Sequence, residues 1–280
     1  MNKLLLVVFT VASLLMSCHA DTKTSRNSSN SVVDTVNQIP ENKTAEKKPE
    51  SVITAKDALV YAYPDFIKSI EGNDIIFTDN SRMAWDDGRD KTFEQKLDDA
   101  DPEDMFSMTY NRHDSAPEYL QDAGRSRCEA LFKKMYGSSA SEVQRNLVSV
   151  DWMGSKVRFT KINGGADSLR KVVDELKRHP EFKKYLSCSG TFYWRAVRGA
   201  KRLSAHSYGI AIDIGVSSSD YWLWRNPRAK ETDRIKYANR IPRGIIEIFQ
   251  KHGFIWGGAW YHYDTMHFEF RPEILKFSKP

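Results

Sequence analysis

The sequence lacks a concentrated basic segment, although its 42 lysines and arginines outnumber its 37 acidic residues. Binding to nucleic acid would need such a cluster, so the formal net charge of +5 predicts no nucleic-acid partner. The sequence also lacks an internal repeat, which argues against a solenoid. Its bulk composition, 40% hydrophobic and 28% charged, is that of an ordinary globular protein and indicates no particular chemistry.

A long hydrophobic run is missing as well. The most apolar stretch, from Leu4 to Met16, follows Lys3 and is too short to cross a membrane as a helix. Its length and its basic flank are those of a signal peptide core, so we expect the chain to be exported.

Cysteine is scarce, and the first of the three cysteines follows the apolar stretch. The segment Leu15-Met16-Ser17-Cys18 resembles the lipobox of bacterial lipoproteins. This resemblance implies a signal peptide over residues 1–18, acylation of Cys18 and attachment to a membrane, with the protein facing the periplasm or the cell wall. Cleavage after Ala20 is the competing interpretation, because that site also ends in a small residue.

Large apolar residues are almost absent from residues 19–50, which are rich in Ser, Asn, Thr, Lys and Glu. Such a segment cannot bury enough surface to fold, so it predicts a flexible tether between membrane and protein. If Cys18 is lipidated, Cys128 and Cys188 remain as a possible disulfide pair in an oxidising compartment. The sequence leaves open whether these two cysteines are close enough to bond.

Helical patterns occur at three places in the rest of the chain. A capping-box arrangement at residues 141–144 predicts a helix to about Val150. An apolar stripe over residues 166–176 predicts a second helix. Pro242 and Gly253 bracket a third.

Short strands are expected around the two motifs described below. The sequence therefore predicts an α+β fold, in which a small antiparallel sheet carries a metal site and helices pack to one side of it. We place this domain at residues 151–280. Residues 51–150 contain no recognisable motif and are expected to form an N-terminal extension of unknown role.

The first motif, Ser204 to Asp213, contains His206 and Asp213. Gly209 is the most plausible turning point between them, because glycine reaches positive φ without steric cost. Three alternating isoleucines follow it, which is the pattern of a strand with Asp213 on its less bulky face. The rival helical interpretation would separate the two Cα atoms by about 10.5 Å, and the β-branched run favours a strand.

The second motif, Asp264 to Glu269, also predicts a strand with a potential metal ligand on one face. In a strand that begins at His267, Phe268 points to one face and the imidazole to the other. Asp264 lies three residues upstream, near enough to reach a metal-bound water, while Glu269 either competes for that role or orients His267. Two imidazoles, one carboxylate ligand and one spare carboxylate are the side chains of a catalytic zinc site.

At these residues the chain resembles the VanY-like zinc peptidases of peptidoglycan. Both the pattern Ser-x-His-x-x-Gly-x-Ala-x-Asp and the later Asp-x-x-His match. The resemblance implies that His206, Asp213 and His267 bind one zinc ion per chain and that Asp264 is the general base. The segment Gly190 to Arg195 also resembles the family segment whose arginine stabilises the transition state, which implies that role for Arg195.

Three further residues are candidates for contact with substrate. A hydroxyl from Ser204 is placed to hold a polar end of the substrate. Tyr208 and Trp260 are candidate lining residues of the cleft, although aromatic residues near such a site are as often supporting core. His262 lies close to the second motif but is expected to be a structural residue rather than a ligand.

These expectations describe a zinc-dependent metallopeptidase that hydrolyses peptide stems of peptidoglycan, either as a D-Ala-D-Ala carboxypeptidase or as an L-alanyl-D-glutamate endopeptidase. The modest positive charge suits an anionic cell wall. The alternative is a non-catalytic zinc-containing module that binds the cell wall, against which Asp264 argues, because ligand retention does not require that carboxylate. A glycosidase with paired carboxylates fits less well, since it needs no histidine ligands.

Overall fold

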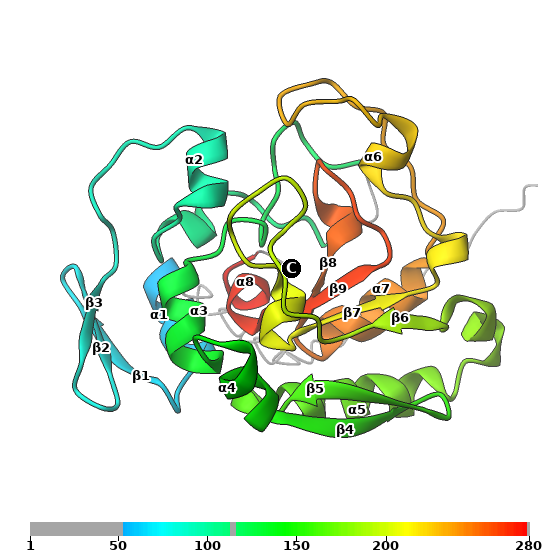
Figure 1. Ribbon diagram of the computed structural model, residues 1–280, viewed down its shortest axis with the longest axis horizontal. Helices are drawn as coiled ribbons and strands as arrows, with labels where there is room; N and C mark the ends of the chain where they lie inside the picture. The colour runs from blue at the N-terminus through cyan, green and yellow to red at the C-terminus, as the bar shows by residue number, and fades with distance from the viewer. Residues whose placement is uncertain (1–52, 113–115, 279–280) are drawn as a thin grey trace, which may run out of the picture. The chain divides into compact units, whose positions relative to one another are not determined.

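The computed structural model describes residues 53–112 and 116–278 (Figure 1). The predicted signal peptide, Cys18 and the tether lie outside the described residues. Residues 51–280 form one compact unit, which has the predicted α+β composition. None of the helices in the described ranges is long and apolar enough to cross a membrane. The predicted extension and the predicted domain, which meet at residue 150, both belong to this unit. Their separate functions stay a prediction.

The central sheet joins the two sequence motifs. Its four antiparallel strands lie in the order β6-β7-β9-β8, with bounds β6 (Cys188–Gly190), β7 (Ala211–Ile214), β9 (His267–Phe270) and β8 (Phe254–Trp256). In the register of β7 and β9, Asp213 pairs with His267 and Ile212 pairs with Phe268. Because side chains alternate along a strand, this register places the carboxylate and the imidazole on one face and the apolar pair on the other.

The apolar face of the sheet packs against helix α7 (Arg243–Lys251). The rings of Phe249 and Phe268 stack with their centroids 3.9 Å apart. The predicted helix is confirmed, with Pro242 as its N-terminal cap and Gly253, at a φ of 91°, beyond its end. His252 caps its C-terminus, and its Nε2 lies 2.8 Å from Glu175 of α5.

Helix α5 (Gly165–Leu176) confirms the second predicted helix. It packs against both α7 and a separate two-stranded sheet made of β4 (Leu147–Trp152) and β5 (Ser155–Thr160). The remaining elements of the C-terminal half are helix α6 (Trp222–Arg225), helix α8 (Pro272–Phe277) and the 3-10 helices Ile162–Gly164, Pro180–Tyr185, Ala205–Tyr208, Val216–Ser218 and Gly257–Ala259.

The helix predicted to run to Val150 is wrong in extent. Helix α4 (Ala140–Arg145) is capped by Ser139 at its start and by Asn146 at its end. The chain then enters strand β4. The physical reason is tertiary pairing: β4 and β5 form a hairpin whose Trp152 is buried and donates from Nε1 to the Leu186 carbonyl at 2.7 Å. This burial outweighs the local helical pattern.

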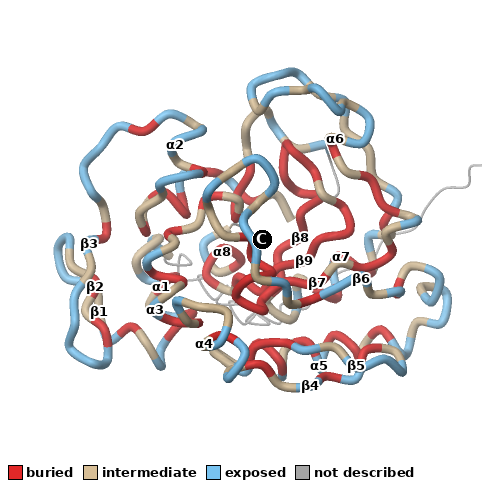
Figure 2. The backbone as a smooth tube through the Cα atoms, viewed as in Figure 1, coloured by how far each residue is buried: buried red, intermediate tan, exposed pale blue. Residues whose placement is uncertain are grey.

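The N-terminal extension packs onto the same core. Its elements are α1 (Ala55–Ala62), β1 (Ile67–Glu71), β2 (Asp74–Phe77), β3 (Arg82–Ala84), α2 (Phe93–Asp98), the 3-10 helix Asp104–Phe106 and α3 (Glu129–Tyr136). Leu59 of α1 and Phe132 of α3 belong to one buried cluster with Phe268. Figure 2 shows the contrast between the buried strands β7 to β9 and the hairpin of β1 and β2, in which buried residues alternate with partly or fully exposed ones. The extension therefore supplies part of the core behind the site.

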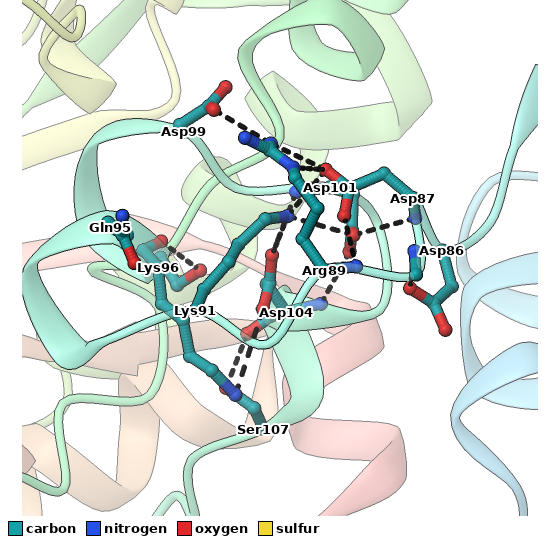
Figure 3. Close-up of polar contacts among 12 residues, drawn as sticks. Asp86, Asp87, Arg89, Lys91, Gln95, Lys96, Asp99, Asp101, Asp104 and Ser107 are labelled. Carbon is teal, nitrogen blue, oxygen red and sulfur yellow. Dashed lines mark hydrogen bonds and ion pairs between the residues drawn. The ribbon is translucent and has the colours of Figure 1, made fainter.

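A buried lysine holds the loop between β3 and the 3-10 helix Asp104–Phe106. The Lys91 ammonium lies 2.6 Å from Asp104 and 2.9 Å from both Asp87 and Asp101 (Figure 3). The lysine side chain is only 2% exposed. The Lys91 ammonium therefore contacts three carboxylates from different parts of this segment, two of which have a second cation nearby, Arg89 at Asp87 and Lys96 at Asp104.

The two cysteines of the described residues are not joined. Cys128 is buried at the N-cap of α3, whereas Cys188 begins strand β6 and is half-buried. Both thiols are free, so the possible disulfide is absent.

Candidate metal centre and active site

The first histidine is positioned by a short turn of 3-10 helix, Ala205–Tyr208. Ser204 caps this turn by accepting a hydrogen bond from the His206 amide. Gly209 ends the turn at a φ of 66°, as the sequence predicted, and a Cβ there would lie 2.4 Å from the side chain of Leu147. Glycine is therefore required where the chain reverses into β7.

The two histidines and Asp213 converge on one point. Nε2 of His206 lies 3.2 Å from Oδ2 of Asp213, and Nδ1 of His267 lies 3.0 Å from Oδ1 of the same carboxylate. All three candidate ligand atoms are within 4.8 Å of one another. This is the convergence that the two sequence motifs predicted.

The remaining nitrogen of each imidazole is held by a second partner. Nδ1 of His206 lies 2.9 Å from the carbonyl oxygen of Thr191. Nε2 of His267 lies 3.3 Å from the carboxylate of Glu269. Histidine ligands of metals generally have such partners, which fix the ring and the tautomer. Of the two roles considered for Glu269, the geometry supports the one that orients His267.

The charges at this point favour a bound cation. Burial alone would lower the pKa of His267, but hydrogen bonds to Asp213 and Glu269 raise it to about 10. Burial would likewise raise the pKa of Asp213, yet the two histidines lower it. The carboxylates of Asp213, Asp264 and Glu269 therefore lie close to the imidazoles of His206 and His267. Both nitrogen and oxygen donors are present. The residues fit a divalent cation such as zinc, which takes this donor set.

Asp264 lies in the same cavity with a free oxygen. Burial and the neighbouring Asp213 raise the pKa of Asp264 to about 6. Its Oδ1 is buried and has no hydrogen-bond partner in the described part of the chain. Buried polar atoms are nearly always paired, so an unpaired carboxylate oxygen indicates a place for water or for a substrate group.

A cavity of about 410 Å³ contains these side chains. Arg195, Ser204 and Trp260 also line it, and their roles toward substrate stay predictions. The Trp260 ring lies beside the His267 ring, with centroids 5.5 Å apart. A second, more open hollow of about 530 Å³ lies along residues 226–235 and has no histidine in its lining.

Tyr208 does not lie where the sequence suggested. It is absent from the lining of the cavity, and its side chain is 1% exposed. Its ring packs against Phe132 at 5.4 Å and Tyr136 at 6.1 Å, on the core side of the turn. The expectation that Tyr208 contacts substrate does not match this position; the other interpretation, that of a supporting core residue, does.

A family model described as D-alanyl-D-alanine carboxypeptidase matches residues 198–270. This segment is similar to the VanY-like peptidase family. The match contains His206, Asp213, Asp264 and His267, whereas Arg195 lies just before it. The chain matches none of the curated proteins and none of the solved structures with which it was compared.

The match supports a peptidase domain of the cell-wall type. His262 of this domain is held outside the metal centre. Its Nδ1 lies 2.5 Å from Asp122, and its Nε2 lies 2.8 Å from the Glu231 carbonyl. The side-chain atoms of these three residues are also close enough to hold an ion, but Arg125 bridges both carboxylates at 2.7 and 2.8 Å. The arginine already supplies the compensating charge, which agrees with the expectation that His262 is structural.

Behind the metal centre of the VanY-like domain, buried charges continue into the N-terminal extension. The Glu269 carboxylate accepts a hydrogen bond from Arg271 at 2.9 Å, and Arg271 also pairs with Glu273. Glu273 in turn accepts a hydrogen bond from the Tyr63 hydroxyl at 2.7 Å. These residues are almost fully buried. A continuous polar chain therefore links His267 to helix α1.

Several residues of the cavity were not predicted from the sequence. Arg127 lies 3.4 Å from the Glu269 carboxylate and lowers the pKa of Glu269 to about 2 against the opposing effect of burial. Arg198 and Trp224 line the cavity, and the Trp224 side chain is 54% exposed. Arg127 belongs to a region without a motif, so only the fold reveals its place. Arg198 lies between Arg195 and the first motif, and no other signal in the sequence indicated its place.

Proposed function

We propose that the protein is a zinc-dependent peptidase that cleaves the peptide stems of peptidoglycan, as a D-Ala-D-Ala carboxypeptidase or as a stem endopeptidase. The observation that carries the proposal is the convergence of His206 and His267 on Asp213, with the unpaired oxygen of Asp264 in the same cavity. His206, Asp213 and His267 would hold the zinc ion. The family match at residues 198–270 supports the same reaction class.

The chain's own residues divide the work of hydrolysis. Zinc, when bound, lowers the pKa of a water molecule and polarises the scissile carbonyl. Asp264 accepts a proton from the attacking water and returns it to the leaving amine, a role that its raised pKa suits near neutral pH. Arg195 donates hydrogen bonds to the carbonyl oxygen as negative charge develops on it.

Ser204 and Trp260 are the candidates for contacts with the bound peptide. Ser204 has its hydroxyl at the edge of the turn that carries His206, and Trp260 covers His267. We assign them to binding rather than to the reaction, because neither group lies where a proton must be transferred.

Metal content tests the ligand set directly. We expect about one equivalent of zinc per chain in the purified protein and its loss in His206→Ala. His179→Ala is the matched control, because His179 is a half-buried histidine that pairs with Glu181, stacks on Phe182 and does not line the cavity. Retention of zinc by His206→Ala would contradict the proposed centre.

A non-catalytic zinc-containing wall-binding module is the second candidate. It predicts no cleavage in any variant, whereas the proposal predicts that Asp264→Asn keeps zinc and loses cleavage. The size of the loss should be about 10²- to 10⁴-fold, which is the usual contribution of a positioned general base. Digestion of defined muropeptides followed by mass spectrometry measures it. Release of terminal alanine alone would identify a carboxypeptidase, and cleavage within the stem an endopeptidase.

The location and the layout of the chain complete the proposal. Lipidation of Cys18 would attach the protein to a membrane, and residues 19–50 would act as the tether toward the wall. Residues 51–150 would brace the peptidase domain at residues 151–280. Labelling with a radioactive fatty acid, and its loss in Cys18→Ser, tests the anchor.

A further inference from the structure

Arginine dominates the charge of the cavity. Five arginines line it, together with two acidic residues, Asp213 and Asp264; the arginines are Arg125, Arg127, Arg195, Arg198 and Arg202. A cavity with this excess of guanidinium groups attracts anions. The question is which of the five are available to a substrate.

Three of the arginines are already compensated by carboxylates of the protein. Arg125 pairs with Asp122 and Glu231. Arg127 pairs with Glu269, and Arg202 with Asp98 of helix α2. These guanidinium groups hold parts of the fold together. They are not free to bind a carboxylate of the substrate without losing an internal partner.

Arg195 and Arg198 have no carboxylate partner among the described residues. Within residues 53–112 and 116–278, the Arg195 guanidinium donates a single hydrogen bond, to the neighbouring Ala196 carbonyl at 3.3 Å. Both are exposed residues that line the cavity. The proposed reaction uses Arg195 at the scissile carbonyl. Arg198 is then the arginine of the cavity lining that has neither a carboxylate partner among the described residues nor a role in the reaction.

The backbone places Arg198 at the tip of a short hairpin, which Figure 1 draws in yellow-green before the 3-10 helix Ala205–Tyr208. Ala196 and Leu203 pair across this hairpin, and the Ala200 amide donates to the Val197 carbonyl at 3.0 Å. Gly199, at a φ of 80°, supplies the conformation that the tip requires.

The base of this hairpin is fixed to the N-terminal extension. The Leu203 amide donates to Glu129 of α3 at 2.9 Å, and the Leu203 carbonyl accepts from Arg127 at 3.4 Å. Arg202 is held by Asp98 of α2. Because α2 and α3 both hold the base of the hairpin, the Arg198 backbone is positioned at the cavity before any ligand binds.

We propose that Arg198 binds a free carboxylate on a substrate residue that adjoins the scissile bond, and so selects acidic peptides over their amidated counterparts. This inference rests on the proposed peptidase function. A guanidinium group matches a carboxylate with two parallel hydrogen bonds, whereas a neutral carboxamide offers one acceptor and no charge. The selectivity belongs to binding, so it should be expressed in KM rather than in kcat.

The test uses two stem peptides that differ in a single group. Both are stem peptides that contain an L-Ala-D-Glu bond and a terminal D-Ala-D-Ala, but one bears a free carboxylate on its glutamate and the other a carboxamide. We expect the wild-type protein to cleave the acidic peptide with a KM about 10-fold lower than that of the amidated peptide. In Arg198→Gln this difference should disappear, because the KM of the acidic peptide rises to that of the amidated peptide.

Two further variants complete the test. Lys201→Gln removes an exposed cation from the same hairpin that does not line the cavity, so it should keep the preference. Arg198→Lys keeps the charge but not the two-pronged geometry, and should retain only part of the preference. If Lys201→Gln removed the preference as fully as Arg198→Gln, general charge rather than Arg198 would be responsible, and the inference would be overturned.

The failure of the inference and the failure of the function are separable. Cleavage of neither peptide by the wild-type protein would remove the proposed function itself. Equal KM values for both peptides in the wild type, or an undiminished preference in Arg198→Gln, would remove the inference and leave the peptidase function intact.

Discussion

Replacement of Lys91 by methionine should destabilise the fold more than the loss of a surface ion pair in the N-terminal extension. The Lys91 ammonium is the shared counterion of Asp87, Asp101 and Asp104. The Asp104 side chain is only 4% exposed, so its charge cannot be solvated when the lysine is removed. Methionine fills a similar volume, which isolates the electrostatic effect from the packing effect.

The magnitude follows from the burial of the partners. Removal of one partner from a buried ion pair costs about 3–5 kcal/mol of unfolding free energy, because an uncompensated charge is left behind. Part of the cost is offset here, since Lys96 lies 3.7 Å from the other oxygen of Asp104. We therefore expect about 3 kcal/mol for Lys91→Met, at the lower end of that range.

Urea denaturation measures this loss through the midpoint and the slope of the transition. The matched control is Arg82→Met, because Arg82 pairs with Asp74 at the surface, where the two side chains are 61% and 48% exposed. Such a pair contributes at most about 1 kcal/mol. The double variant Lys91→Met with Asp104→Asn should recover part of the loss, since it removes the stranded charge as well.

The same cluster predicts a dependence on pH. Burial alone would raise the pKa of Asp101, but backbone hydrogen bonds from Asp104 and Asp87 and the Lys91 ammonium outweigh it and lower the pKa. A carboxyl group with a lowered folded pKa stabilises the fold above its unfolded pKa of about 3.9, and this stabilisation is lost as the pH falls toward the folded value. The wild-type protein should therefore lose unfolding free energy below about pH 4, and Lys91→Met should lose less there.

Two results would refute this reasoning. One is an unfolding free energy for Lys91→Met within about 1 kcal/mol of the wild type, which is the size expected of a surface pair. The other is an equal loss for Arg82→Met, which would mean that burial does not decide the contribution of these ion pairs.

Three further outcomes are expected at the site. Glu269→Gln should weaken zinc binding by about 10- to 100-fold in a competition titration, because His267 loses its charged partner; unchanged affinity would exclude that orienting role. Gly209→Ala should lower the unfolding free energy by about 1–3 kcal/mol in urea, since its Cβ would clash with Leu147, whereas Gly154→Ala, with nothing within 4 Å of the added carbon, should cost less. A chelator should abolish cleavage and added zinc should restore it, an outcome that a metal-independent hydrolase would not give.

The strands of the site could be predicted because their signals are local. The alternation of isoleucines after Gly209 and of phenylalanines after His267 reports which side chains face the core, and the structure pairs those two strands directly. A carboxylate and an imidazole on the opposite face must then lie side by side. Helices α5 and α7 could be predicted for the same reason, from the apolar stripe of α5 and from Pro242 and Gly253 at the ends of α7.

Other features depend on contacts between distant parts of the chain and leave no local signal. The segment after Asn146 follows a capping pattern at residues 141–144, but pairing with β5 and the hydrogen bond from buried Trp152 to the Leu186 carbonyl make it a strand. Tyr208 stands beside His206 in the sequence, yet the tight turn directs its ring into the core toward Phe132. The partners Arg127 and Glu269 are 142 positions apart, so neither periodicity nor spacing could have related them.

The buried polar chain from His267 to Tyr63 has a consequence for anyone who would transplant this active site. Glu273 meets the Tyr63 hydroxyl across 210 positions of sequence, in a place that water does not reach. A fragment that contains only the two motifs would remove the hydrogen-bond donor of Glu273. Glu273 pairs with Arg271, which pairs with Glu269, and Glu269 holds the candidate ligand His267, so the loss would affect the position of that ligand. The smallest portable version of this catalyst therefore begins at helix α1.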